Sequence, residues 1–581
     1  MGVRTLRRYR FACTALTSAA RRAPYPRRWV AASGERDLTA SQTEAASPIL
    51  AWLGARSVWQ RRGAALLAGA AATLGHAPFQ FVPVYVAAIV LLVWLLDGAA
   101  AKESRVWPRM GRGFALGWWF GLGHMTTGLY WISSAFNVDS AAWGPLWGVP
   151  ATIALAMVLA LFFGAGCALA MTLWTADVRR IPWFAACLFV SEWLRGNVLF
   201  GGFPWILPGY IWTPGEPISQ LASLIGIYGL SLLTLLVAAA PAAIVDSGRA
   251  GARFAPTLVA ALLVGLTWGW GVQRLSRAPI EPPGAKPVVR VADSGLSQAD
   301  KWSGRPDQEW RVLARYLAAS GPPDNRAAIL VWPEGAIPVV NFWMLENPAF
   351  LDAVGRGLGD RVLIAGLTRR ELQPEGIAIF NSAAIIDGVS GAPRISEQIY
   401  DKHHLVPGGE YIPLWSLISN LNIAPLQRIG AGFDAGAMPT RLIIPDAPPA
   451  VVLICYEAIF PGMIPRGEAR PGWIVSVTND AWFGRGTGPW QHYAMARYRS
   501  IEEGLPMARA ASGGVSAIVD SYGQEAASTQ GRALYAEAQL PPALVETVFA
   551  RMGNILLPLL LVIVAAMRLF PAFTMGRKQN Q

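Results

Sequence analysis

Long apolar stretches occupy the first half of the chain, and shorter ones occupy most of the second half. A helix needs roughly 20 mainly apolar residues to cross a bilayer. On that length we predict eight membrane spans, at residues 63–79, 82–97, 113–135, 150–174, 181–199, 219–245, 254–272 and 553–571. The pattern therefore predicts a polytopic α-helical membrane domain over 63–272 and one more membrane helix near the C-terminus.

Between the seventh and eighth predicted spans, the apolar runs shorten to a length typical of β-strands. These runs are PVVRVAD, AAILVWPE, RVLIAGL, NSAAIID, RLIIP, VVLICYE, GWIVSVTND and VSAIVD, and they alternate with helical stretches such as 307–319 and 489–504. Many strands with interleaved helices predict an α/β domain over 288–552, built as an α-β-β-α sandwich of two sheets with helices outside. The proline-rich stretch 273–287 is then a linker, and 553–581 holds the last helix and a short end.

Lysine and arginine in the loops predict which side of the membrane each loop faces. Basic residues follow the second, fourth, sixth and eighth spans, at Lys102, Arg105, Arg109, Arg112, Arg179, Arg180, Arg249, Arg253, Arg577 and Lys578. The intervening loops at 76–83, 136–149 and 196–218 contain neither lysine nor arginine. By the positive-inside rule the basic loops are cytoplasmic, so the segment 273–552 is expected outside the cytoplasm.

Composition agrees with a membrane protein, because 53% of the 581 residues are hydrophobic and only 15% are charged. The formal net charge of +12 does not point to nucleic acid, since nine arginines lie within the first 36 residues. We interpret residues 1–62 as a cytoplasmic tail without apolar periodicity, disordered and held against anionic lipid.

Three segments each deliver one chemically useful side chain. VVLICYE brings Cys455 to a predicted strand end, AAILVWPEGAIP brings Glu334, and YDKHHLVPGGEYIP brings Lys402. A thiol attacks an acyl carbon as the thiolate, a carboxylate can take its proton, and an ammonium can stabilise the oxyanion that forms. Taken singly, each residue has a simpler explanation as a core cysteine, a solvated glutamate or a surface lysine. Taken together, they suit acyl transfer through a thioester.

The cysteine count favours a functional role for Cys455. Cys13 falls in the predicted tail, and Cys167 and Cys187 fall in predicted spans, so Cys455 alone lies in the exported domain. It therefore has no partner there for an intramolecular disulfide. Neither a second cysteine nor a suitable histidine spacing accompanies it, so we predict no metal and no other cofactor.

Longer motifs carry a resemblance to a known family. In the exported domain these are WPEGAIP, YDKHHLVPGGEYIP, CYEAIF and SVTNDAWFGRGTGPWQHYAMARYRSIEEGLPMARAASGGVSAIVD, and in the membrane domain ATLGHAPFQFVP, GWWFGLGHMTTGLYWI, SEWLRG and GGFPWILPGY. They resemble the apolipoprotein N-acyltransferase family, the membrane-embedded branch of the nitrilase, or carbon-nitrogen hydrolase, superfamily. The resemblance runs from about residue 63 to the C-terminus and predicts a nitrilase-like fold for the exported domain.

The resemblance implies a reaction and a site. Such enzymes transfer an acyl chain from a membrane phospholipid, through a cysteine thioester, to the free N-terminal amine of a diacylglyceryl-cysteine lipoprotein. By resemblance, Cys455 is the nucleophile, Glu334 the general base and Lys402 the oxyanion stabiliser. Glu410 would orient the lysine or assist proton transfer. Glu457 and Tyr456 match positions needed for activity or local structure. Apart from these matches, we expect Asn479, Trp482 and Phe483 to shape the acyl pocket or its lid, with a core role as the alternative for the two aromatic residues, and Trp205 to touch the lipid substrate.

The same resemblance implies partners and a location. We expect a phospholipid donor, diacylglyceryl-modified apolipoproteins and membrane lipid as partners, no nucleic acid, and a monomer. The expected location is the bacterial inner membrane, with the catalytic domain on the periplasmic face. Three rival functions stay open: an exported amidase or nitrilase that uses water, a transferase with another acceptor such as a polyprenyl-linked sugar, and a catalytically silent scaffold.

Four positions depart from the family pattern. They are Asp293-Ser294-Gly295 after the first strand, Gly335 after the glutamate, Gly408 in the lysine motif and Ser512-Gly513 before GVS. Since Gly408 stands where the family has a large ring, we expect a wider pocket that accepts different or bulkier acyl donors.

Overall fold

The computed structural model describes residues 48–138, 146–247, 249–277, 287–301, 307–323, 327–336, 345, 347–374, 376–388, 393–415, 432–529 and 534–569. Most of the predicted N-terminal tail, including Cys13, lies outside this part of the chain. The tail boundary predicted at residue 62 is wrong, because helix α1 (Pro48–Gly54) and the first turns of helix α2 (Val58–Ala72) already form before it. A capping box between Ser57 and Gln60 fixes the start of α2.

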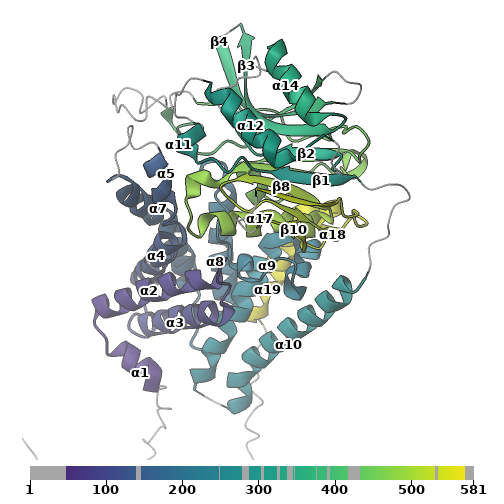
Figure 1. The fold of residues 1–581 in the computed structure, drawn as a ribbon. Helices are drawn as coiled ribbons and strands as arrows, with labels where there is room; N and C mark the ends of the chain where they lie inside the picture. Colours follow the sequence, from purple (N-terminus) through teal and green to yellow (C-terminus); the bar gives the residue numbers. More distant parts are fainter. Residues whose placement is uncertain are drawn as a thin grey trace, which may run out of the picture. The chain divides into compact units, whose positions relative to one another are not determined.

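Helices make up the first half of the described chain (Figure 1). After α2 come α3 (Val82–Ala100), α4 (Val106–Gly128), α5 (Ile132–Val138), α7 (Gly148–Thr172), α8 (Arg180–Asn197), α9 (Ala222–Ala239) and α10 (Ala250–Leu275), and α18 (Val548–Met552) and α19 (Leu556–Ala566) follow the strands. Within the described residues, five stretches are long and apolar enough to cross a membrane, namely Val82–Ala100, Gly148–Thr172, Pro217–Val245, Ala250–Leu275 and Val548–Leu569. The protein is therefore membrane-embedded.

The other three predicted spans fall on α2, α4 and α8, which are helical but less apolar. α4 is long enough to span, but Arg109, Arg112 and His124 keep its apolarity low. Its glycines serve close packing. A Cβ on Gly69 of α2 would overlap the Phe120 carbonyl of α4, and a Cβ on Gly123 of α4 would overlap the Leu66 carbonyl of α2. Small residues at such crossings let membrane helices approach closely.

The second half contains two sheets. The first has the order β11-β1-β2-β3-β4-β5 and the second the order β10-β9-β8-β7-β6. The strands are β1 (Val288–Ala292), β2 (Ile329–Trp332), β3 (Val362–Gln373), β4 (Gly376–Asp387), β5 (Arg394–Asp401), β6 (Ala450–Ile454), β7 (Trp473–Asn479), β8 (Met507–Ser512), β9 (Ala517–Val519), β10 (Glu525–Ser528) and β11 (Tyr535–Gln539). β1, β2 and β3 run parallel, as do β6, β7 and β8, so the ends of these neighbours meet at one edge of each sheet.

The two sheets share a buried core. Val289 and Val331 of the first sheet pack in one cluster with Val452 and Val475 of the second. Helices α12 (Gln308–Ser320) and α14 (Pro348–Leu358) cover the other face of the first sheet, and α17 (Gly488–Glu503) lies against the second sheet (Figure 1). The side of α17 away from the sheet packs against the membrane helices, where the Tyr498 hydroxyl donates to the Trp212 carbonyl at 2.7 Å.

One predicted strand is wrong, and four observed strands were not predicted. RLIIP forms no strand: its described residues make only a single bridge, between Leu442 and Ala450, because prolines interrupt the chain on both sides of Ala447. β5, β8, β10 and β11 were not predicted, since their sequences alternate or mix polar residues and lack the long apolar run of a buried strand.

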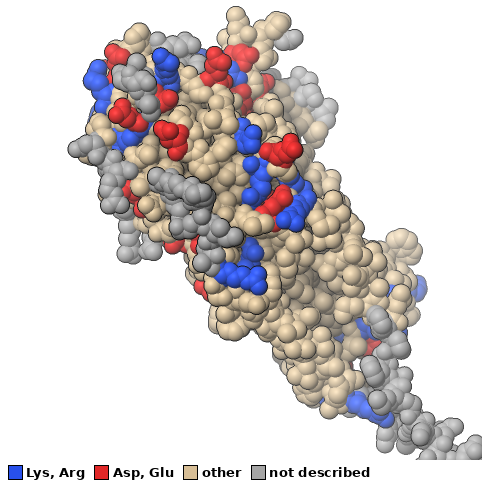
Figure 2. All heavy atoms as spheres, turned by 90° about the vertical axis from the view of Figure 1, so that its right-hand side faces the viewer, with Lys and Arg blue, Asp and Glu red and all other residues tan. Residues whose placement is uncertain are grey.

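Charge is unevenly distributed over the surface. On the face shown in Figure 2, acidic and basic side chains gather over the sheets, while a wide area over the helices carries few charges. Helix α10 contributes Leu258, Leu262 and Leu266 to the exposed apolar surface. An apolar surface of this kind on helices of spanning length is what a lipid environment requires.

Candidate active site

The ends of four strands bring together the side chains that the sequence singled out. Glu334 follows β2, Lys402 follows β5, Cys455 follows β6, and Asn479 ends β7. The Asn479 backbone N–H donates to Glu334 Oε2 at 2.8 Å, which joins the edges of the two sheets. Parallel strands thus place residues far apart in sequence at one edge, where ligands usually bind in α/β folds.

Cys455 stands at a sharp change of direction. Strand β6 ends at Ile454, and a 3₁₀ turn (Cys455–Ile459) begins at the cysteine, whose φ is +50°. A non-glycine residue rarely adopts this left-handed conformation, which costs roughly 1 kcal/mol or more. Burial raises the pKa of the Cys455 thiol, the Glu334 carboxylate raises it further, and the Lys402 ammonium lowers it. The thiol is therefore neutral at rest and needs a base before it can attack.

Lys402 is fully buried between two carboxylates. Its Nζ lies 2.9 Å from the Glu410 carboxylate and 3.4 Å from Glu334 Oε1. Burial alone would lower the pKa of Lys402, but the charges of Glu410 and Glu334 outweigh burial and raise it. Lys402 therefore stays charged, as an oxyanion-stabilising group must be.

Asn381 of β4 connects the same two carboxylates, and sequence reasoning missed it. Its Nδ2 donates to Glu334 Oε1 at 2.6 Å and to Glu410 Oε1 at 2.7 Å. The Val406 backbone N–H donates to the other Glu410 oxygen at 2.8 Å. The only signal in the sequence is a polar residue at the start of the apolar run NSAAIID.

Glu457 and Tyr456 hold loops together beside the nucleophile. The buried Glu457 carboxylate accepts hydrogen bonds from the Tyr400 hydroxyl at 2.6 Å and from the backbone N–H groups of Ile454 at 2.7 Å and His403 at 2.8 Å. Glu457 thereby ties the Cys455 turn to the loop that carries Lys402. The Tyr456 hydroxyl donates to the Gly202 carbonyl at 2.8 Å, which ties the same turn to the membrane domain.

Trp205 lies inside a buried aromatic cluster between the membrane helices and α17. Its ring centroid is 4.8 Å from that of Trp131 and 5.8 Å from that of Phe483. The indole N–H groups of Trp205 and Trp131 both donate to Gln491 Oε1, at 2.7 and 3.2 Å. Trp482 is half-buried next to the cluster. Gln491 was not predicted, because its importance depends on a contact between residues 360 positions apart.

The positions that depart from the family pattern divide into two groups. Gly335 and Gly408 have φ values of +56° and +79°, and no atom lies within 4 Å of the place where a Cβ would sit. The other two departures meet each other, since the Gly513 N–H donates to Asp293 Oδ2 at 3.1 Å. Ser512 accepts a hydrogen bond from the buried Lys301 at 2.7 Å.

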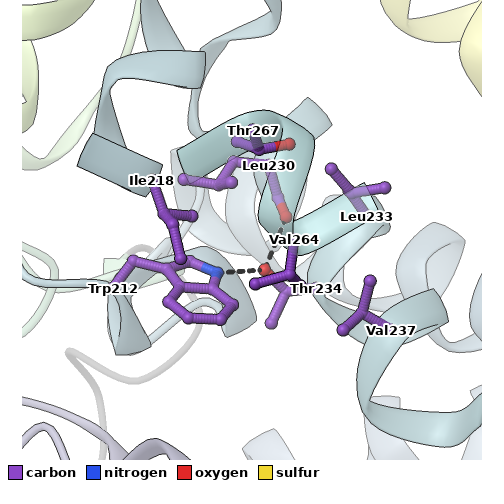
Figure 3. A pocket seen from close by; sticks show the side chains of 8 residues that line it. All are labelled: Trp212, Ile218, Leu230, Leu233, Thr234, Val237, Val264 and Thr267. Atoms are coloured by element: carbon purple, nitrogen blue, oxygen red, sulfur yellow. Dashed lines mark hydrogen bonds between the residues drawn. The ribbon is translucent and has the colours of Figure 1, made fainter. Parts of the chain in front are cut away.

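A small pocket lies away from this site, between α9 and α10 (Figure 3). It is lined by Trp212, Ile218, Leu230, Leu233, Thr234, Val237, Val264 and Thr267. The Trp212 indole donates to Thr234 Oγ1 at 2.9 Å, and the Thr234 hydroxyl donates to the Leu230 carbonyl at 2.7 Å (Figure 3). The pocket lining contains no carboxylate, thiol, imidazole or charged group that could activate an ester. Over the described residues, no cluster of three or more His, Cys, Asp or Glu side chains could hold a metal ion.

Comparison with known proteins finds a family match for each half of the chain. A family model described as the apolipoprotein N-acyltransferase N-terminal domain matches residues 68–240, and one described as carbon-nitrogen hydrolase matches residues 290–548. The chain is 40% identical over 512 residues to an apolipoprotein N-acyltransferase of Bradyrhizobium diazoefficiens, covering 86% of this chain and 92% of that one. It is 38% identical over 519 residues to the protein of the same name in Rhodopseudomonas palustris, covering 87% and 93%. Among solved structures, Saccharomyces cerevisiae Nit3, of the nitrilase superfamily, aligns with 44% of this chain and 90% of its own at 18% identity and a TM-score of 0.31.

Proposed function

The chain belongs to the apolipoprotein N-acyltransferase family, and from this membership we propose that it moves a fatty acyl chain from a membrane phospholipid, through a Cys455 thioester, to the N-terminal amine of a diacylglyceryl-cysteine apolipoprotein. The observation that carries the proposal is the meeting of Glu334, Lys402 and Cys455 at one buried strand edge of a membrane-embedded chain. A soluble amidase needs no such membrane half.

In the first half-reaction, Glu334 removes the Sγ proton, and the Cys455 thiolate attacks the ester carbonyl of the phospholipid. The neutral resting thiol supports this use of Glu334 as the base. The Lys402 ammonium stabilises the oxyanion of the tetrahedral intermediate. When the intermediate collapses, the ester C–O bond breaks, and protonated Glu334 returns the proton to the leaving lysophospholipid oxygen.

In the second half-reaction, the amine of the apolipoprotein attacks the thioester carbonyl. The amine proton passes to Glu334 as the amide bond forms, the C–S bond breaks, and the thiolate regains the proton. Glu410 and Asn381 hold Lys402 and Glu334 in place for both steps. Because the phospholipid acylates the thiol and the lysophospholipid leaves before the amine takes the acyl chain, the kinetics are ping-pong.

The finer organisation is part of the same proposal. We propose eight spans, with α2, α4 and α8 added to the five most apolar stretches, a linker at 273–287, and a catalytic domain at 288–552 on the periplasmic face of the inner membrane. The protein acts as a monomer. Trp205, Asn479, Trp482 and Phe483 shape the acyl pocket, and Glu457 and Tyr456 support the nucleophile turn.

Gly408 offers a test of acyl-donor preference. Open space at its missing Cβ supports a widened pocket, so Gly408→Phe is expected to narrow the range of accepted acyl chains. The backbone there has a φ of +79°, which strains any side chain. Gly408→Ala is therefore the matched control, because it shares the strain and lacks the ring. An acyl-donor profile that is the same in both variants and in the wild type would contradict the wider pocket.

The function is tested by intact-mass analysis after incubation with phospholipid vesicles. We expect a fatty-acyl mass increment on the wild type that hydroxylamine removes, no increment on Cys455→Ala, and a normal increment on Cys187→Ala, a buried cysteine of α8. Adding a diacylglyceryl-cysteine peptide should then discharge the adduct and acylate the peptide amine. A folded wild type that forms no adduct with any phospholipid, or an adduct that only water discharges, would overturn the proposal.

A further inference from the structure

A buried histidine touches the nucleophile residue through its backbone. His492 of α17 lies with its Nε2 3.1 Å from the Cys455 carbonyl oxygen and its Nδ1 2.8 Å from Asp480 Oδ1. His492 and Asp480 are both fully buried. Neither residue belongs to the group that carries out the proposed bond-making steps, and neither was singled out from the sequence.

Both partners of the ring can only accept hydrogen bonds. A backbone carbonyl has no proton to donate, and an ionised carboxylate has none either. For the contact with the Cys455 carbonyl, Nε2 must therefore carry a hydrogen and donate it. Nδ1 lies near both Asp480 Oδ1 and Arg509 Nη2, and Arg509 Nη2, 3.2 Å away, also donates to the second Asp480 oxygen at 2.8 Å.

Asp480 is held rigidly for this purpose. The Thr478 hydroxyl donates to Asp480 Oδ1 at 2.9 Å, and burial would raise the pKa of this carboxyl, but the charges of Arg509 and His492 lower it. The carboxylate is thus ionised and accepts from three directions. A fixed carboxylate orients the imidazole, as such pairs do in other catalytic sites.

The Cys455 backbone needs such support because its φ of +50° is disfavoured for a side chain. A strained residue keeps its conformation only when its surroundings hold it there. We propose that His492 and Asp480 are positioning residues that fix the Cys455 carbonyl, and through it the direction of the thiol; this inference rests on the proposed role of Cys455. The ring also packs 5.6 Å from Trp205 and from Phe483, so the aromatic cluster limits its movement.

The test uses two substitutions that each keep one half of the imidazole. The amide of His492→Gln can reach the Cys455 carbonyl in place of Nε2, whereas the shorter amide of His492→Asn can reach only Asp480. We expect acyl-Cys formation from phospholipid to slow by about tenfold or more in His492→Asn, with little change in KM, and to slow clearly less in His492→Gln. Glu525→Gln, a partner of Arg497 on the other side of α17, is the control and should keep the wild-type rate.

A second readout separates this inference from the function itself. Alkylation of Cys455 by iodoacetamide, measured by peptide mass, reports how reactive the thiol is and requires no acyl transfer. The alkylation rate should fall most in His492→Asn and less in His492→Gln. If the wild type forms no acyl adduct, the proposed function fails while alkylation still tests the positioning. Equal alkylation rates in His492→Asn, His492→Gln and the wild type would overturn the positioning role of His492. Should His492→Asn fail to fold, Asp480→Asn replaces it, and a wild-type alkylation rate in Asp480→Asn would overturn the inference equally.

Discussion

Asn381 places one side-chain amide between two carboxylates that would otherwise repel each other. Its two N–H groups lie 2.6 and 2.7 Å from Glu334 and Glu410, on the side away from bulk water. The residue therefore fixes the positions of Glu334 and Glu410 relative to each other and to Lys402.

Replacing this amide should impair the proposed chemistry. Asn381→Leu removes both donors that hold Glu334 and Glu410 in place, so we expect acyl-enzyme formation to slow by roughly 10- to 100-fold. Asn381→Asp adds a third carboxylate and should be slower still. Rapid-quench mass measurement of the acyl-enzyme checks both variants. If Asn381→Asp reacts as fast as the wild type, Asn381 has no such role.

At the scale of single elements, α17 does the most to connect the molecule. Its Gln491 accepts the indole hydrogens of Trp131 and Trp205, its His492 supports the nucleophile, and its Glu502 accepts the backbone N–H of Ile227 at 2.7 Å. Ile227 follows Gly226, whose φ of +66° breaks the regular course of α9. Glu502 thus satisfies a backbone group that the break in a membrane helix leaves free.

Gln491 is expected to matter for stability. Gln491→Leu leaves two buried indole N–H groups without an acceptor, at a cost of about 1–3 kcal/mol each. We expect a lower melting temperature in detergent and faster proteolysis between the two halves of the chain. Gln373→Leu, on the exposed β3–β4 hairpin, is the control. A Gln491→Leu protein as stable as this control would show that the two indoles find other partners.

The end of α17 should make stability depend on pH. Burial raises the pKa of Glu503 to about 8. The charge of Glu502 raises this pKa as well, while the charge of Arg466 lowers it. In the unfolded chain the carboxyl titrates near its ordinary value of 4.5. Between those two values the folded protein retains a proton that the unfolded chain loses, so stability falls as pH rises from about 5 to 8, by at most about 1.4 kcal/mol per pH unit.

Melting curves across this range check the sign. The wild type should melt at lower temperature at pH 8 than at pH 5, and Glu503→Gln should show a flatter dependence because it has no proton to lose. Glu397→Gln, an exposed residue of β5, should keep the wild-type slope. Equal slopes in all three proteins would mean that Glu503 is not the group responsible.

The elements that the sequence predicted well are those whose own residues carry the signal. β2, β6 and β7 are short apolar runs. Glu334 follows β2 by two residues, Cys455 comes directly after β6, and Asn479 ends β7, which is why these residues could be placed at strand ends. β8 was missed because MARAAS carries a buried arginine and serine, whose partners come from other elements. Asn381, Gln491 and His492 were missed for the same reason: a polar residue on an apolar element acquires its meaning only from contacts with distant segments.

At the scale of the whole molecule, the catalytic residues and the membrane helices form a continuous structure. Tyr456 of the nucleophile turn binds the Gly202 carbonyl, and Arg195 holds the same loop by donating to the Phe203 carbonyl at 2.6 Å. Arg195 also forms an ion pair with Glu192, and both side chains are fully buried in α8. The loop between α8 and α9 is therefore fixed from both sides, and its contact with the site favours a membrane-borne substrate.

The orientation across the membrane that the loop charges predict gives the last prediction. Gln373, at the exposed hairpin of the catalytic domain, should lie outside the cytoplasm, and Ser247, exposed between α9 and α10, should lie inside. In a Cys13→Ser background, a membrane-impermeant maleimide should label Gln373→Cys in spheroplasts and Ser247→Cys only after lysis. The three cysteines of the described chain are buried, so they add little background. Labelling of Ser247→Cys in intact spheroplasts, with Gln373→Cys protected, would invert the topology. The proposed phospholipid and lipoprotein substrates would then have to reach the site from the cytoplasmic leaflet.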